Sequence, residues 1–273
     1  MKAAFIGSGN MASAIIGGLI KQAFVPSSLY AIDPDESARE RISRTFDIRT
    51  GSCIDGALDS FDTIVLAVKP QILPRVCEEL KPILSDQLVI SIAAGVGAAH
   101  IAQWLGGYDR VVRAMPNTPA MIGMGVTGLT ALAAVTDAQR ARVTALMESV
   151  GEVVWMNDEA QIDAVTAISG SGPAYVFYFM EAMQSAAQRL GLDEKQGRAL
   201  VFATFAGSVQ LAARSDQSVE DLRQRVTSKG GTTAAAISSF DTSKVNESIV
   251  QGISHAYSRA IEMREMPPDQ PMP

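Results

Sequence analysis

The first half of the chain alternates short apolar runs with amphipathic stretches, and this alternation limits what the chain can fold into. Apolar runs bounded by Gly, Pro or Asp predict strands over residues 2–6, 29–32, 63–68, 88–93 and 110–115. Helical patterns lie between them, over residues 11–22, 35–46, 71–80 and 97–105. Strand–helix–strand repetition is typical of a parallel sheet covered by helices on both faces. The sequence therefore predicts a doubly wound α/β domain of the Rossmann type.

The pattern changes near residue 158. Before that point, Thr136 and Gln139 form a capping-box pattern that opens a further helix, and residues 151–156 resemble a last strand. Helical patterns alone then begin at residue 159 and continue over 173–190, 194–213, 219–226 and 243–265. We expect two domains, a dinucleotide-binding domain over 1–158 and an all-α domain over 159–273.

One helical segment of the second domain is apolar all round. Residues 174–180 read Ala-Tyr-Val-Phe-Tyr-Phe-Met. Such a helix is normally buried on every side. In a chain of 273 residues the covering surface is expected to come from a second copy, so the helical domain is predicted to form a homodimer.

The composition excludes several classes of function. The chain has 23 Lys and Arg against 29 Asp and Glu, which is not the basic surface that nucleic acid or an anionic membrane attracts. The charge-free stretches 3–20, 114–136 and 164–180 are interrupted by Gly, Pro or Asn, so none predicts a membrane span. Two cysteines and two histidines, without metal-ligand spacing, argue against a zinc site or a histidine-driven triad. We expect a cytoplasmic protein without a metal.

A glycine-rich loop follows the first predicted strand and opens the first helix. It reads Gly7-Ser-Gly-Asn-Met-Ala12, a G-x-G-x-x-A pattern. The first glycine makes the turn, the second lets a pyrophosphate approach, and the helix N-terminus faces its charge. A purely structural turn is the alternative, but the strand–loop–helix setting favours dinucleotide binding. The expected ligands are Ile6, Gly7, Ser8, Gly9, Asn10 and Met11.

An acidic residue, Asp33, ends the second predicted strand. A carboxylate at this position can accept a hydrogen bond from the ribose 2′-hydroxyl of NAD, and it repels the 2′-phosphate of NADP. Arg39, Arg41 and Arg44 on the following helix could offset that repulsion, although Arg44 could equally lie on a solvated face. The residues alone leave the choice between NADP(H) and NAD(H) open.

Loops after later strands add candidates, because the carboxyl ends of the strands line the ligand crevice in this architecture. Lys69 could meet a phosphate or act as an acid, or it could be a surface lysine before a helix. Asn117, held between two prolines, could bind the nicotinamide carboxamide or its ribose, or cap its own turn. The expected cofactor contacts in these loops are Ala67, Val68, Lys69, Pro70, Ala94 and Asn117.

Two further glycine motifs lie in the second half. Ser169-Gly-Ser-Gly-Pro173 does not fit the G-x-S-x-G nucleophile pattern and is interpreted as a break between helices, with Pro173 opening the second. Thr227-Ser-Lys-Gly-Gly-Thr-Thr233 is not a phosphate-binding P-loop; it is a hydroxyl-rich turn that leads into a helix at Ala234. Exposed amides at a helix start suit a carboxylate, and a plain helix cap is the alternative.

Taken in order, these motifs resemble those of pyrroline-5-carboxylate reductase, from Phe5 to about Phe240. The most specific strings are Met115-Pro-Asn-Thr-Pro119 and Ser169-Gly-Ser-Gly-Pro-Ala-Tyr175. The resemblance implies hydride transfer from NAD(P)H to the C=N bond of 1-pyrroline-5-carboxylate, giving L-proline in the last step of proline biosynthesis. It also implies a helical domain that intertwines with its partner in a dimer, and dimers that in this family can assemble into larger rings.

The same resemblance assigns the substrate site. Thr233 would hydrogen-bond the ring nitrogen, and Ser228 with the backbone of Gly230, Gly231, Thr232 and Thr233 would hold the carboxylate. Two positions depart from the family pattern. Asp33 stands where members often carry a small polar residue near the 2′-phosphate, which leaves the preference for NADPH or NADH open. Lys229 stands where proline is frequent, and it adds positive charge near the carboxylate.

Two alternative functions are compatible with the same two-domain architecture. β-Hydroxyacid dehydrogenases carry a catalytic lysine on a central helix, but this chain has no lysine between residues 82 and 194. A non-catalytic nucleotide-binding protein could use the same fold. The hydroxyls of the 227–233 turn disfavour that second reading.

Overall fold

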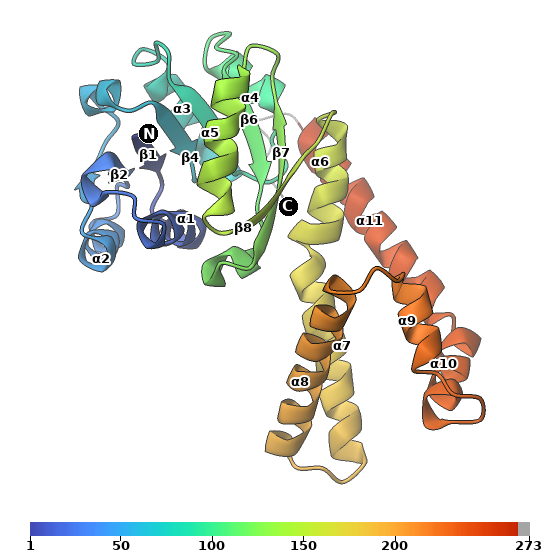
Figure 1. Cartoon of the computed structure of the whole chain (residues 1–273). Helices are drawn as coiled ribbons and strands as arrows, with labels where there is room; N and C mark the ends of the chain where they lie inside the picture. The colour runs from blue at the N-terminus through green and yellow to red at the C-terminus, as the bar shows by residue number, and fades with distance from the viewer. Residues whose placement is uncertain (267–273) are drawn as a thin grey trace. The chain divides into compact units, whose positions relative to one another are not determined.

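The computed structural model describes residues 1–266 and divides them into two compact units (Figure 1). Unit 1 consists of Met1–Ser171 together with the C-terminal segment from Ala256, and unit 2 of Gly172–His255. The division after residue 158 stays a prediction about functional domains.

Unit 1 is built on an eight-stranded sheet in the order β3-β2-β1-β4-β5-β6-β7-β8. Neighbouring strands are parallel except β6 and β7, which pair antiparallel. The predicted doubly wound fold is therefore confirmed. The strands are β1 (Ala3–Ile6), β2 (Leu29–Ile32), β3 (Arg49–Gly51), β4 (Thr63–Leu66), β5 (Leu88–Ser91), β6 (Val111–Met115), β7 (Gly125–Ala131) and β8 (Gly151–Trp155).

Helices cover both faces of this sheet and give it two separate cores (Figure 1). On one face Phe5 of β1 packs with Ile15 of α1 and Leu146 of α5, and on the other Ile6 packs with Leu73 of α3. Successive residues of a strand point to opposite faces, so both must be apolar. The helices are α1 (Asn10–Lys21), α2 (Glu36–Phe46), α3 (Leu73–Leu80), α4 (Ala98–Trp104) and α5 (Asp137–Glu148), with short 3-10 turns η1 (Pro26–Ser28), η2 (Gly56–Ser60), η3 (Pro70–Ile72) and η4 (Thr118–Ile122).

Two strands were absent from the sequence-based prediction. The three-residue edge strand β3 carries no apolar run. The strand β7 lies in a glycine-rich stretch, and its glycines serve packing rather than turns. A Cβ on Gly128 would approach Cγ1 of Val165 to 2.7 Å, and one on Gly125 would approach the backbone of Ala120 to 2.8 Å. Close approach of neighbouring segments to the strand thus explains a pattern that resembled a loop.

The end of unit 1 combines α6 (Ala160–Val165), the π-helical turn η5 (Thr166–Gly170) and the last part of α11 (Val245–Glu265). The motif from Ser169 to Pro173 is thus a helix break, as predicted, and α7 starts at Gly172, one residue before Pro173. In unit 1, Met263 of α11 packs on Gly95, where an added Cβ would lie 2.9 Å from the Met263 methyl carbon.

Unit 2 is entirely helical, as predicted. It holds α7 (Gly172–Arg189), α8 (Glu194–Ala213), α9 (Val219–Arg225), α10 (Thr232–Thr242) and the first part of α11. Helices α7 and α8 form a hairpin (Figure 1), in which Gly197 lies against Ala187. Helix α10 begins at Thr232 rather than at Ala234, because Gly231 takes the N-cap position.

The apolar segment of α7 is not buried within the single chain. Phe177 is 63% exposed and Tyr178 72% exposed. The expectation of burial on every side is therefore not met by residues 1–266 of one copy. Within the same residues, no helix has the length and apolar character needed to cross a bilayer.

Candidate active site

The glycine loop between β1 and α1 is shaped by backbone contacts that only glycine allows. Gly7 has a φ of +103°, and a Cβ there would lie 2.5 Å from the carbonyl oxygen of Ala67, just after β4. The amide of Gly7 donates to the carbonyl of Ile32 at the end of β2. The fold thus brings Gly7, Ile32 and Ala67 together at the carboxyl ends of three adjacent strands, beside Ile6, the last residue of β1.

The start of α1 presents unoccupied hydrogen-bond donors. Gly9 is the N-cap and supplies no side-chain cap, and nothing lies within 4 Å of where its Cβ would be. The exposed Asn10 and the half-buried Met11 follow it. The buried Ser8 hydroxyl has no hydrogen-bond partner within residues 1–266. Open backbone amides at a helix start, next to an orphaned hydroxyl, fit the pyrophosphate of a dinucleotide.

Asp33 lies directly beside this loop. Its Oδ2 accepts a hydrogen bond from the amide of Ser8 at 2.8 Å, and its Oδ1 accepts one from the amide of Asp35 at 3.0 Å. Arg41 donates to the carbonyl of Ser8 at 3.0 Å. A carboxylate and a guanidinium therefore border the glycine loop from the β2–α2 segment.

The loops after β4 and β5 lie along the same edge of the sheet. Val68 packs against the turn at Gly7, with its Cγ1 3.1 Å from the position of an added Cβ. Lys69 is exposed and makes no ion pair with the described residues, so both of its predicted roles stay open. Pro70 opens η3, and Ala94 lies half-buried in the turn before Gly95, whose φ is +71°.

Asn117 has an arrangement that the sequence did not predict. Its side-chain Nδ2 donates to the carbonyl of Ser169 at 3.1 Å, and its Oδ1 accepts from the amide of Val126 at 3.0 Å. It does not cap its own turn. The amide thus ties the end of β6 to β7 and to the π-helical turn. Its contact with a cofactor stays a prediction, with one donor hydrogen and one acceptor lone pair left.

The hydroxyl-rich turn of unit 2 gathers the predicted substrate ligands. The amide of Gly231 donates to the carbonyl of Ser228 at 3.0 Å, and Gly230 has a φ of +74°. This compact turn leads directly into α10, where Thr232 and Thr233 occupy the first helical turn and no side chain caps the helix. Ser228 and Thr232 are exposed, and Thr233 is half-buried.

A buried ionic cluster in unit 1 escaped the sequence analysis. Arg113 of β6, only 1% exposed, lies 3.4 Å from Glu159 and 3.5 Å from Asp163, and Asp163 also pairs with Arg264 at 3.3 Å. Glu159 accepts a hydrogen bond from the amide of Ala98, the first residue of α4. Burial lowers the pKa of Arg113, and the two carboxylates oppose that shift. The signal in the sequence was an arginine inside the apolar strand 111–115.

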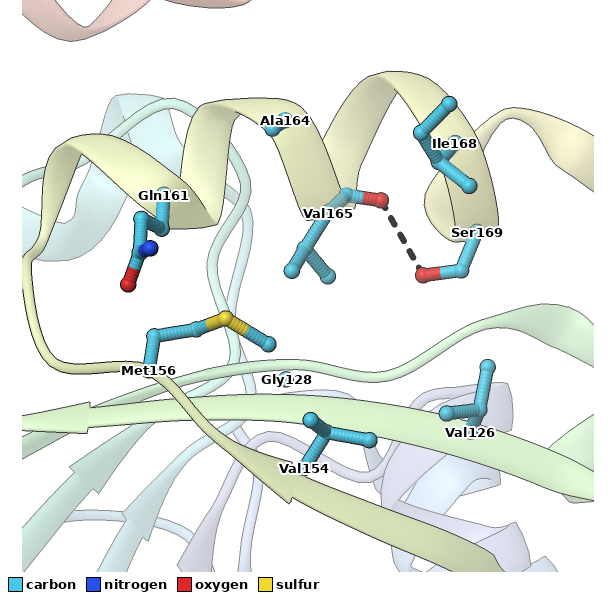
Figure 2. Close-up of a pocket in the computed structure, with 9 residues that line it drawn as sticks. All are labelled: Val126, Gly128, Val154, Met156, Gln161, Ala164, Val165, Ile168 and Ser169. Atoms are coloured by element: carbon cyan, nitrogen blue, oxygen red, sulfur yellow. Dashed lines mark hydrogen bonds between the residues drawn. The ribbon is translucent and has the colours of Figure 1, made fainter.

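An apolar groove lies between the β7–β8 edge and α6 (Figure 2). In Figure 2 the side chains of Val126, Val154 and Met156 face Val165 across it, and Ser169 donates to the carbonyl of Val165 at 3.0 Å. None of the predicted site residues lines the groove. The groove is therefore separate from the glycine loop.

Comparison with known proteins identifies the family. Residues 159–263 match a family model described as pyrroline-5-carboxylate reductase dimerisation, and residues 2–95 match one described as NADP oxidoreductase, coenzyme F420-dependent. The chain is 44% identical to pyrroline-5-carboxylate reductase of Pseudomonas aeruginosa over 96% of both sequences.

Solved structures agree with this match. One is a pyrroline-5-carboxylate reductase of Coxiella burnetii, 40% identical, with a TM-score of 0.90 over 97% of this chain and 99% of the other. Another is the Plasmodium falciparum enzyme with NADP bound, 29% identical, with a TM-score of 0.85 over 96% of this chain and 98% of the other. The motifs, the fold and these similarities together establish that the chain belongs to the pyrroline-5-carboxylate reductase family.

Proposed function

We propose that the chain reduces the C=N bond of 1-pyrroline-5-carboxylate with NAD(P)H to give L-proline, the final step of proline biosynthesis. This proposal is carried by the hydroxyl-rich turn over residues 228–233, which leads into α10 without a side-chain cap on that helix. The turn belongs to a chain that is 44% identical over almost its full length to a pyrroline-5-carboxylate reductase. The alternative hypothesis, a β-hydroxyacid dehydrogenase, requires a lysine on the helix after Pro173, and this chain has none there.

The cofactor is NADP(H) or NAD(H), and unit 1 binds it. When bound, the reduced nicotinamide supplies the hydride. The open amides at Gly9, Asn10 and Met11 fit the pyrophosphate charge, and the carboxylate of Asp33 fits a ribose hydroxyl. The remaining contacts that we propose are Ile6, Gly7, Ser8, Ala67, Val68, Lys69, Pro70, Ala94 and Asn117.

The substrate is held by the turn of unit 2. Ser228 and the backbone amides from Gly230 to Thr233 bind the carboxylate, with the positive charge of Lys229 nearby. The Thr233 hydroxyl hydrogen-bonds the ring nitrogen and orients it. A cyclic imine can be protonated before or on binding, so the reaction needs no strong acid from the protein. Positioning then supplies most of the catalysis, which agrees with a chain that has only two histidines.

We also propose that the protein works in the cytoplasm as a homodimer, with neither nucleic acid nor membrane as a partner. A match to the family's dimerisation model over 159–263 and the exposed aromatic side chains of α7 support the dimer. We extend this proposal to a larger ring of dimers, which the resemblance to the family implies. A dinucleotide-binding domain over 1–158 and a substrate-binding and dimerisation domain over 159–273 complete the proposal.

The decisive test mixes the purified protein with 1-pyrroline-5-carboxylate and either reduced nucleotide. We expect loss of the reduced nicotinamide absorbance in step with formation of L-proline, identified by chiral chromatography. Parallel reactions with the oxidised nucleotides and 2- or 3-hydroxy acids should show no turnover. Oxidation of a hydroxy acid would favour the β-hydroxyacid dehydrogenase reading. Nucleotide binding without any turnover would favour a non-catalytic protein.

A further inference from the structure

The carboxylate of Asp33 is immobilised at the edge of the glycine loop. One of its oxygens accepts from the amide of Ser8 at 2.8 Å, and the other from the amide of Asp35 at 3.0 Å. Both donors are backbone groups of the loops that border the proposed cofactor cradle. The carboxylate therefore cannot rotate away from a ligand without losing two hydrogen bonds. Each oxygen keeps a further lone pair for a ligand hydroxyl.

The arginines of α2 offset the negative charge of the Asp33 carboxylate only in part. Arg39 bonds the carbonyls of Asp33 and Pro34 at 2.8 Å each, and Arg44 pairs with Glu40 at 3.0 Å with its side chain 80% exposed. Arg41 bonds the carbonyl of Ser8 and is exposed. Of these three, Arg41 is the one that contacts the glycine loop. One fixed negative charge and one surface guanidinium thus lie beside the same peptide.

We propose that Asp33 makes this chain bind NADH more tightly than NADPH, and that Arg41 reduces the penalty against NADPH. This inference rests on the proposed dinucleotide site. The ribose of NADH offers the carboxylate a 2′-hydroxyl donor, whereas NADPH brings a phosphate of charge about −2 to a group that cannot move. A preference of roughly 10- to 100-fold is expected, the scale of one charge-assisted hydrogen bond.

The test measures dissociation constants of NADH and NADPH by titration calorimetry, without substrate. The wild type should bind NADH more tightly. Asp33→Ser should reverse or abolish the preference, mainly by tightening NADPH. Arg41→Gln should weaken NADPH more than NADH. The matched control Arg44→Gln removes an arginine from the same helix and should leave both constants unchanged.

A second variant covers the case in which Asp33→Ser disturbs the loop. Asp33→Asn keeps the size and one acceptor oxygen but removes the charge, so it should tighten NADPH while the melting temperature stays within a few degrees. Titration with AMP and adenosine 2′,5′-bisphosphate, which lack the nicotinamide, should show the same ranking as the dinucleotides.

The outcomes separate this inference from the proposed function. Equal or tighter binding of NADPH by the wild type, or an unchanged ratio in both Asp33 variants, overturns the role of Asp33 even if L-proline is formed. An NADH preference that the Asp33 variants remove supports it even if 1-pyrroline-5-carboxylate is not turned over. Binding of neither nucleotide overturns the dinucleotide site and this inference with it.

Discussion

Units 1 and 2 bury their apolar side chains to very different extents. The two cores of unit 1 are made by its own strands and helices, and residues such as Phe5, Ile15 and Leu66 are fully buried. In unit 2, among the described residues, Ala187 and Val201 are the buried apolar side chains, while Phe177, Phe202 and other large ones are exposed. Unit 1 therefore has a complete core within one chain, and unit 2 does not.

This difference indicates how the two units are stabilised. An exposed apolar area of this extent usually marks an interaction surface. The apolar segment of α7 lies within the match to the family's dimerisation model. We thus expect the stability of unit 1 to be independent of protein concentration and that of unit 2 to depend on it, since association stabilises by mass action.

The largest effect is expected from a charge on the exposed face of α7. Phe177→Glu should convert the dimer to monomer, because two symmetry-related phenyl groups together contribute about 5 kcal/mol, or roughly 10³- to 10⁴-fold in the dimer dissociation constant. Sedimentation velocity over a dilution series measures this. Val25→Glu, at an equally exposed apolar residue of unit 1, should leave the dimer intact. A Phe177→Glu protein that remains dimeric would show that the exposed face of α7 does not hold the dimer together.

The next largest effect should come from the ionic cluster inside unit 1. Arg113→Ala removes the cation beside the partly exposed Glu159 and leaves the buried carboxylate of Asp163 with Arg264 alone, which should cost about 3 kcal/mol of unfolding free energy. Urea denaturation should show this loss at every protein concentration. Arg75→Ala removes an exposed arginine that pairs with Glu79 at 2.8 Å, and should cost less than about 1 kcal/mol. Equal losses of unfolding free energy in the two variants would show that burial of the ion pair does not determine its contribution to stability.

Thr233→Ala tests whether substrate binding belongs to unit 2 and dinucleotide binding to unit 1. Loss of the hydroxyl that we propose to orient the ring nitrogen should lower kcat/KM by roughly 10- to 1000-fold, the scale of one oriented polar contact. The affinity for the dinucleotide should stay unchanged, because the proposed dinucleotide site lies in unit 1. Thr242→Ala, at the other end of α10, is the control and should retain full activity. Full activity of Thr233→Ala would refute the assignment of Thr233.

The smallest effects should come from two equivalent helix caps. Thr136 caps α5 in unit 1 and Asp193 caps α8 in unit 2, each in a capping box with a glutamine three residues later. Replacement by alanine should cost about 1 kcal/mol in each case. Thermal melts should show a concentration-independent loss for Thr136→Ala and a concentration-dependent one for Asp193→Ala. A concentration dependence in both would mean that unit 1 also relies on association.

Local patterns predicted much of the fold. The predicted boundaries of α8 and β2 agree with the structure, and the capping box at Thr136 forms as expected. Predicted strands over 63–68 and 88–93 end earlier, at Leu66 and Ser91, because their last residues enter the loops at the edge of the sheet. The strand β7 was missed because its glycines allow the close approach of the Ala120 backbone and the Val165 side chain.

The candidate site likewise has features that local sequence predicts and features that depend on long-range contacts. By itself the sequence determined the glycine loop, the hydroxyl-rich turn and the order of the family motifs, because turns, caps and helix starts depend on residues a few positions apart. Tertiary structure alone decided that Asn117 bonds Ser169 and Val126, that Arg113 is buried between two carboxylates, and that Ser8 holds Asp33 in place. These contacts join residues that are distant along the chain, so only the packing of strands and helices can bring them together.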